Sequence, residues 1–292
     1  MKGTIHKLYI SLFFLIGILS LTLLTVNGFS YYSLPLEQRV FSTQHLSLKP
    51  SGIIGHGLGI LGSLMMIVGV STYMIRKRFR MFFHWGYLKY WLEFHIFLCT
   101  VGPLFVLYHT AFKFGGIVAV SFWSMVVVVL SGFAGRFIYV QIPRTIQGRE
   151  LDIRELNKTE DELTEQLRTD YSLNENILSG LNEHYKPSKY TSLTLTQSLT
   201  EIIKEIFATR KFTKELRRTL RSNGNTDRNR TDEVIKIART KITLSRRIGM
   251  LRTMQKLFRY WHIFHLPFAL SMFIIMVIHV AVTIVFGYKW IF

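Results

Sequence analysis

Five apolar runs alternate with charged segments along the chain, at residues 8–27, 53–75, 91–112, 117–140 and 262–287. A helix rises about 1.5 Å per residue, so roughly 20 apolar residues cross the hydrocarbon core of a bilayer. Each run has about that length. The pattern predicts an all-α, polytopic membrane helical bundle with five transmembrane helices.

The expected organisation has five parts. They are the first transmembrane helix (1–30), an outer loop (31–52), transmembrane helices 2–4 (53–140), a helical insert (141–260) and the last transmembrane helix (261–292). The first run follows Lys2 and Lys7, as in a signal peptide, but it exceeds the usual ~7–15 apolar residues and no A-x-A site follows. A retained first span is therefore predicted. The insert is interpreted either as a helical hairpin extending from two membrane helices or as a docking surface for a redox partner.

Basic residues set the expected orientation. The connection at 76–80 reads RKRFR, and the segment 141–260 holds 24 Lys or Arg against 16 Asp or Glu. By the positive-inside rule the N-terminus and the insert are cytoplasmic and the C-terminus is outside, as in a multi-pass protein of the bacterial inner membrane. The net charge of +18 then reflects topology and contact with membrane lipid, and no nucleic-acid partner is expected. Cys99 is the one cysteine, which excludes an intrachain disulfide and a cysteine-ligated iron–sulfur cluster.

Two of the apolar runs carry histidines at the same spacing. His95 and His109 are 14 positions apart, and so are His265 and His279. In a helix this step rises about 21 Å and turns about 1400°, which puts both rings on one face. The two helices run in the same direction, so His95 pairs with His265 near the cytoplasmic surface and His109 with His279 near the outer one. Each pair supplies the two axial ligands of a haem iron; the alternative is four separate histidines satisfied within the bundle.

The arrangement resembles the dihaem cytochrome b of quinol-oxidising respiratory complexes and related bacterial b-type cytochrome subunits, over residues 52–140 and 260–288. The resemblance implies that four of the five helices form a dihaem core and that glycines make room for the haem faces. Gly55 and Gly69 are also 14 apart, and Gly102 lies midway between two histidines; packing between helices is the alternative. The chain departs from the family in its first span, its insert and its lack of the proline–glutamate quinol-site signature.

Several other residues are candidates near the haems. Arg136 lies at the depth of His95, where it either meets a haem propionate or snorkels to the surface. Arg39 and Lys113 are candidates for meeting a propionate of the other haem, near the outer surface. His56 is interpreted in three ways, as a replacement for His279, as a quinone ligand, or as a histidine bonded to the backbone.

Two six-coordinate haems leave no open iron position, so the expected chemistry is one-electron transfer. The sequence predicts a b-type cytochrome subunit with two non-covalent haems, carrying electrons between the quinone pool and a partner chain that bears iron–sulfur, flavin or c-type haem. It would be the electron-transfer subunit of a membrane oxidoreductase complex rather than an enzyme alone. The alternative is a non-redox membrane scaffold that recruits a partner through the basic insert. A transporter with histidine proton relays is disfavoured by the scarcity of acidic residues in the spans.

Overall fold

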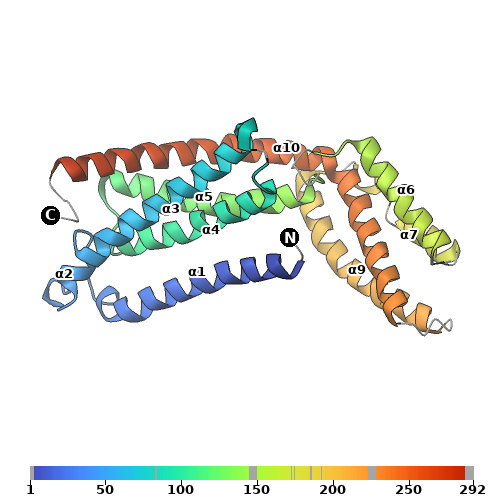
Figure 1. Cartoon of the computed structure of the whole chain (residues 1–292), viewed down its shortest axis with the longest axis horizontal. Helices are drawn as coiled ribbons and strands as arrows, with labels where there is room; N and C mark the ends of the chain where they lie inside the picture. The colour runs from blue at the N-terminus through green and yellow to red at the C-terminus, as the bar shows by residue number, and fades with distance from the viewer. Residues whose placement is uncertain are drawn as a thin grey trace. The chain divides into compact units, whose positions relative to one another are not determined.

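The computed structural model describes residues 3–286 except 83, 145–149, 172, 174, 185, 192 and 223–227. This described part is helical, and its one β-type pairing is an isolated bridge between Arg144 and Glu150. The chain divides into two compact units (Figure 1). Among the described residues, the membrane unit holds 3–134 and 263–286, and the insert unit holds 135–144 and 150–262.

The five helices that are long and apolar enough to cross a membrane confirm the predicted count. They are α1 (Gly3–Tyr32), α3 (Ile53–Arg78), α4 (Leu88–His109), α5 (Gly116–Gln141) and α10 (Arg228–Val285). Between α1 and α3 the chain forms the short helices η1 (Arg39–Phe41) and α2 (His45–Leu48). Helix α4 ends before the predicted residue 112, because Ala111 and Phe112 have φ of 47° and 59°, a left-handed backbone that stops a helix.

Helices α3 and α4 pack closely through glycine. A Cβ built on Gly62 would lie 2.6 Å from the Gly102 carbonyl oxygen, and one built on Gly102 would lie 2.8 Å from the Gly62 carbonyl oxygen. Any side chain at either position would therefore push the two backbones apart. Small residues permit this approach in membrane helices, where apolar side chains gain little by leaving lipid for a neighbouring helix.

The insert unit is a helical bundle with its own core. It comprises the C-terminal end of α5, α6 (Ile153–Thr169), α7 (Glu175–His184), α8 (Ser188–Thr191), α9 (Leu195–Ser222) and the N-terminal part of α10. The short helix η2 (Arg80–Phe82) belongs to the membrane unit. Its buried apolar residues form two clusters, one around Leu167, Leu178 and Leu216 and one around Leu156, Ile202 and Met254. The sequence predicted helices here, and the structure adds that they bury a common interior.

Helix α10 begins well before residue 261, where the last transmembrane helix was expected to begin. It runs without interruption from Arg228 to Val285, starting in the insert unit and ending in the membrane unit. Pro267 lies inside it, and no breaker interrupts the residues around position 260. The predicted boundary at 260/261 thus marks a change from charged to apolar composition within one helix.

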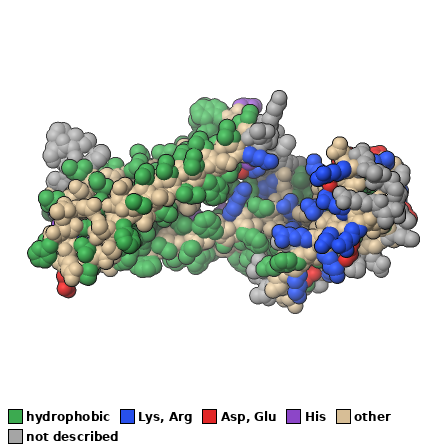
Figure 2. Space-filling model, turned by 90° about the horizontal axis from the view of Figure 1, so that it is seen from below, with side chains coloured by type: hydrophobic (Ala, Val, Ile, Leu, Met, Phe, Trp, Pro, Cys, Tyr) green, Lys and Arg blue, Asp and Glu red, His purple; other side chains and the backbone are tan. Residues whose placement is uncertain are grey.

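The two units have different surfaces. Figure 2 shows hydrophobic side chains over the membrane unit and Lys and Arg gathered over the insert unit on the face in view. On α1, Leu8 is 70% exposed and Phe14 is 67% exposed. Exposed apolar surface on this scale is what a lipid-facing helix presents, so the surface is compatible with a multi-pass membrane protein.

Candidate functional site

His95 is held by the backbone of the neighbouring helix. Its Nδ1 lies 3.1 Å from the carbonyl oxygen of Gly69 on α3 and 3.5 Å from the Cys99 Sγ atom. Because a carbonyl oxygen only accepts, Nδ1 carries the proton in this bond. The bond fixes the tautomer in which Nε2 has the lone pair, the arrangement found for histidines that ligate metals.

His109 repeats the arrangement near the other end of α4. Its Nδ1 lies 2.8 Å from the Gly55 carbonyl oxygen. A Cβ on Gly59 would lie 2.7 Å from the same Nδ1, so this glycine gives the imidazole room to reach α3. The 14-residue spacing of the two histidines on α4 is therefore matched by two carbonyl acceptors, of Gly55 and Gly69, spaced 14 apart on α3.

Three histidine rings come together in the membrane unit. The ring centroid of His109 lies 6.5 Å from that of His279 on α10 and 6.3 Å from that of His56 on α3. Three helices thus bring three imidazoles to one place, with His109 near both others. His279, the expected partner of His109, lies beside it, and so does His56, the expected alternative.

His265 has a side-chain partner instead of a carbonyl. Its Nδ1 lies 2.7 Å from the Ser131 hydroxyl on α5, and this hydroxyl donates to the Val128 carbonyl oxygen at 2.9 Å. With the hydroxyl proton engaged in that bond, the serine oxygen accepts from Nδ1. Nδ1 therefore carries the proton in His265 as well, and any coordination by this ring would use Nε2.

Protein atoms occupy the space next to the three candidate glycines. A Cβ on Gly69 would lie 3.0 Å from the Leu98 Cβ atom, and one on Gly55 would meet the Lys49 carbonyl oxygen. Gly102 faces the Gly62 carbonyl, as described above. The structure places Gly69 and Gly102 where α3 packs closely against α4, and Gly55 against the end of α2 and the turn that follows it. Gly55 and Gly69 additionally offer their carbonyls to His109 and His95.

The candidate arginines make protein contacts. Arg136 belongs to the insert unit, where its guanidinium carbon lies 5.7 Å from the centre of the Tyr139 ring. Arg39 is 5% exposed and donates to the carbonyl oxygens of Tyr32 (2.8 Å), Leu34 (2.9 Å) and Ala111 (2.6 Å). Arg39 therefore ties η1 to the ends of α1 and α4, and the propionate role considered for it stays a prediction.

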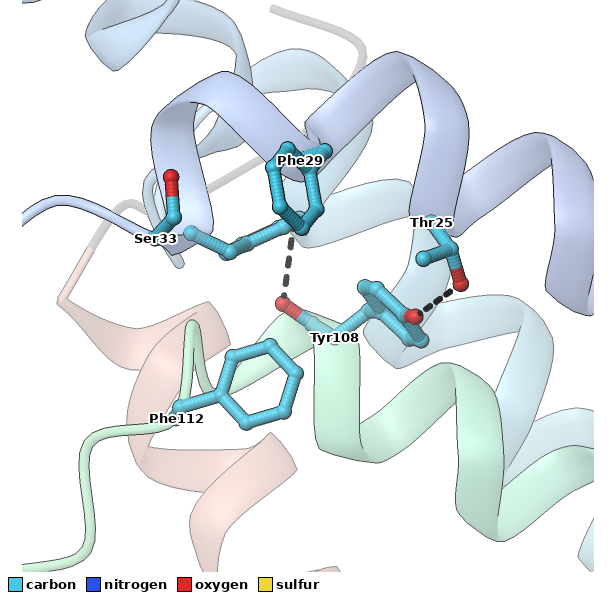
Figure 3. A pocket seen from close by; sticks show the side chains of 6 residues that line it. Thr25, Phe29, Ser33, Tyr108 and Phe112 are labelled. Carbon is cyan, nitrogen blue, oxygen red and sulfur yellow. Dashed lines mark hydrogen bonds between the residues drawn. The ribbon is translucent and has the colours of Figure 1, made fainter.

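Sequence reasoning missed an aromatic cavity between α1 and the end of α4, lined in part by Tyr108, the residue before His109. It measures about 250 Å³ and is lined by Thr25, Phe29, Tyr32, Ser33, Tyr108 and Phe112 (Figure 3). One sequence signal was available, because Thr25, Phe29 and Tyr32 follow each other at helical spacing on one face of α1. A second was the position of Tyr108 directly before His109.

Among the residues that the structure describes, no group of three or more His, Cys, Asp or Glu side chains is arranged to hold a metal ion. A structural zinc site takes four protein ligands, whereas a haem iron needs at most two, because the porphyrin supplies the others. Paired imidazoles, such as those of His109 and His279, suit the second kind of centre. No family model, curated protein or solved structure matches the chain.

Proposed function

We propose that the chain is the b-type cytochrome subunit of a membrane oxidoreductase complex, carrying electrons across the membrane between the quinone pool and a partner redox protein. Its two non-covalent haems would be held by His95 with His265 and by His109 with His279. The observation that carries the proposal is the 6.5 Å separation of the His109 and His279 ring centroids. An imidazole nitrogen binds a metal at about 2 Å, so two rings on opposite sides of one iron have centroids roughly 6 Å apart.

The hydrogen bonds to Nδ1 support the same assignment. Three of the four histidines have this nitrogen engaged, by the carbonyls of Gly69 and Gly55 and by the Ser131 hydroxyl. These bonds orient each ring and raise the basicity of Nε2 as a ligand. The glycine carbonyls and the serine thus act as positioning groups for the proposed ligands.

Haem with two imidazole ligands supplies one-electron transfer, since its iron keeps no open position for substrate. The spacing of the histidines on α4 separates the two proposed centres by about 21 Å along the helix. The apolar surface of the membrane unit would place them at two depths of the bilayer, and the basic connections would orient the inner centre toward the cytoplasm. The direction of electron flow then depends on the partners and on the membrane potential, which contributes about 2.3 kcal/mol per charge for each 100 mV.

The test is haem content in the purified full-length chain. We expect two haems per chain with a split reduced absorption band, and one haem in each of His95→Ala and His279→Ala. His262→Ala is the matched control: it lies on the same helix, with its Nδ1 3.0 Å from the Phe258 carbonyl oxygen, and should keep both haems. Protein that contains no iron, or variants that keep both haems, would contradict the proposal. Loss of haem in His56→Ala in place of His279→Ala would reassign the outer ligand.

A non-redox scaffold is the second candidate, favoured by the separate core of the insert unit. A domain with its own core can bind a partner whatever the histidines do. In that case His95→Ala would leave partner capture unchanged and the wild-type chain would carry no haem. The haem measurement therefore separates the two functions.

A further inference from the structure

The aromatic cavity has polar groups in an otherwise apolar wall. The Thr25 Oγ1 and Tyr108 hydroxyl atoms lie 2.7 Å apart, and the Tyr32 hydroxyl donates to the Tyr108 carbonyl oxygen at 3.4 Å. Figure 3 shows Thr25 and Phe29 of α1 opposite Tyr108 of α4, with Phe112 beside them. A pocket with apolar walls and a few placed hydroxyls is the usual form of a small-molecule site.

Three of the lining rings meet edge to face. The ring centroids are 5.3 Å apart for Tyr32 and Tyr108, 5.3 Å for Tyr32 and Phe112, and 5.5 Å for Tyr108 and Phe112. Such pairs are among the favoured geometries of aromatic side chains. They line the cavity with ring surface, against which another flat ring can stack.

The backbone around the cavity is held in place by a buried charge. Phe112 and its neighbour Ala111 have positive φ, which costs about 1–3 kcal/mol for each non-glycine residue and persists only where the surroundings enforce it. Arg39 donates to the carbonyls of Ala111 and Tyr32, one on each side of the cavity. Its guanidinium thereby fixes the two segments that carry Phe112 and Tyr32.

We propose that this cavity binds the head group of a lipid-soluble quinone. The Thr25 hydroxyl donates to the Leu21 carbonyl oxygen, so the Tyr108 hydroxyl is the donor in their mutual bond. The Tyr108 hydroxyl can turn from Thr25 to an oxygen of the quinone ring, a match that a lipid acyl chain does not offer. The volume of about 250 Å³ suits one or two fused rings, being close to the lower end of the roughly 300–1,000 Å³ of small-molecule sites. Phe29 is 67% exposed, so the isoprenoid tail can leave along an apolar surface.

The inference rests on the proposed function for its role, because Tyr108 directly precedes His109, the proposed outer haem ligand. The quinone would exchange its electrons at that centre. It would bind from the outer side of the bilayer, where the ends of α1 and α4 lie in the proposed topology. Helix α1, the first span, which the dihaem cytochrome b family lacks, would thus supply half of the site.

The experiment measures binding of tritiated menaquinone-2 to the full-length chain in phosphatidylethanolamine–phosphatidylglycerol nanodiscs. Saturable binding, displaced by unlabelled menaquinone-2, is expected in the wild type. Tyr108→Phe should weaken it about 3–10-fold, the effect of losing one hydrogen bond. Thr25→Val removes only the acceptor that competes for the Tyr108 hydroxyl and should not weaken binding. Ser20→Ala is the matched control on the same helix: Ser20 bonds the carbonyl four residues earlier, as Thr25 also does, but lies outside the cavity. The Ser20→Ala protein should bind menaquinone-2 with the same affinity as the wild type.

No saturable binding in the wild type, or wild-type affinity in Tyr108→Phe, would overturn the site. A second measurement covers variants that fold poorly: a photoreactive azidoquinone should label the wild-type peptides that contain Phe29 or Phe112, and labelling confined to other peptides would also overturn it. Haem content is measured on the same samples. Two haems without quinone binding would refute the inference alone, and quinone binding without haem would refute the proposed function alone.

Discussion

The membrane unit and the insert unit are both helical, yet their helices are held together by different contacts. In the membrane unit α3 meets α4 backbone to backbone at Gly62 and Gly102. In the insert unit leucines such as Leu167 and Leu178, both fully buried, fill the space between helices. Burying leucine is favourable when the alternative is water, at about 25 cal/mol per Å², whereas in lipid close contact of small residues takes its place. The difference is the one expected if the membrane unit lies in lipid and the insert unit in water.

Buried charges differ in the same way. In the insert unit the Lys241 Nζ lies 3.2 Å from a Glu160 oxygen, and an Arg246 nitrogen lies 3.4 Å from a Glu205 oxygen. In the membrane unit the buried Arg39 instead donates to three backbone carbonyls. Side-chain ion pairs thus tie together helices of the insert unit, while backbone acceptors satisfy Arg39 at the end of the membrane helices.

The largest effect is expected from breaking an ion pair in the insert unit. Glu160→Ala leaves the Lys241 ammonium, whose side chain is 4% exposed, without its carboxylate. Removing one partner of such a pair costs about 3–5 kcal/mol in the free energy of unfolding. Hydrogen exchange of the full-length protein should show the loss of protection in α6 and in the N-terminal part of α10, with α3 and α4 unchanged.

Glu162→Ala is the control for this change. Glu162 lies on the same helix and pairs with Lys158 at 4.0 Å, but the two side chains are 64% and 80% exposed. Exposed pairs at this spacing contribute about 0.3–0.5 kcal/mol. Equal effects of the two substitutions on the free energy of unfolding would show that burial of the Lys241–Glu160 pair does not add to stability.

A smaller effect is expected at the glycine contact of the membrane unit. Gly62→Ala places a Cβ 2.6 Å from the Gly102 carbonyl oxygen, so α3 and α4 must separate. Overpacking of this kind costs about 1–3 kcal/mol. Exchange should increase in α3 and α4 and stay unchanged in α6, the reverse of the Glu160→Ala pattern.

Gly132→Ala provides the matched control on α5. A Cβ at Gly132 meets nothing within 4 Å, and alanine favours a helix over glycine by up to about 1 kcal/mol. We therefore expect Gly132→Ala to leave the thermal stability of the detergent-purified protein unchanged or to raise it slightly. If Gly132→Ala destabilised the protein as much as Gly62→Ala, the close approach of α3 and α4 would not be the cause.

The sequence predicted features that depend on local periodicity. The five membrane helices follow from the lengths of the apolar runs, and the meeting of His109 with His279 follows from a shared 14-residue spacing on two spans. The proposed haems remain a prediction. The roles of Gly55 and Gly69 were harder to infer, since one sequence does not reveal that their carbonyls face histidines of α4.

Features that depend on tertiary contacts were not predictable. Arg39 was considered for an outer propionate; its acceptors come from two segments, one at the end of α1 and one at the end of α4, that only the fold brings together. The aromatic cavity needs α1 to lie against the end of α4. Helical spacing puts its α1 residues on one face of that helix but does not indicate which helix the face meets. The core of the insert unit was hidden for a related reason, since amphipathic helices can pack together or lie apart.

The smallest expected effect is a pH dependence of the insert unit. Burial raises the pKa of Glu205 above its usual value of 4.5, and the neighbouring Arg246 opposes this shift without cancelling it. Because the folded state then binds the proton more tightly than the unfolded state does, the contribution of Glu205 to stability is full below about pH 4.5 and is lost as the pH rises through the folded pKa. Unfolding followed from pH 4 to pH 8 should show this fall.

Glu205→Gln isolates this contribution, because glutamine keeps a hydrogen-bonding group beside Arg246 and does not titrate. The difference in unfolding free energy, wild type minus variant, should decrease as the pH rises. If it increases instead, the attraction of Arg246 outweighs burial and the pKa of Glu205 is lowered. The sign of this slope tells which of the two dominates at a buried ion pair of the insert unit: the loss of water around the carboxylate or the charge of its partner.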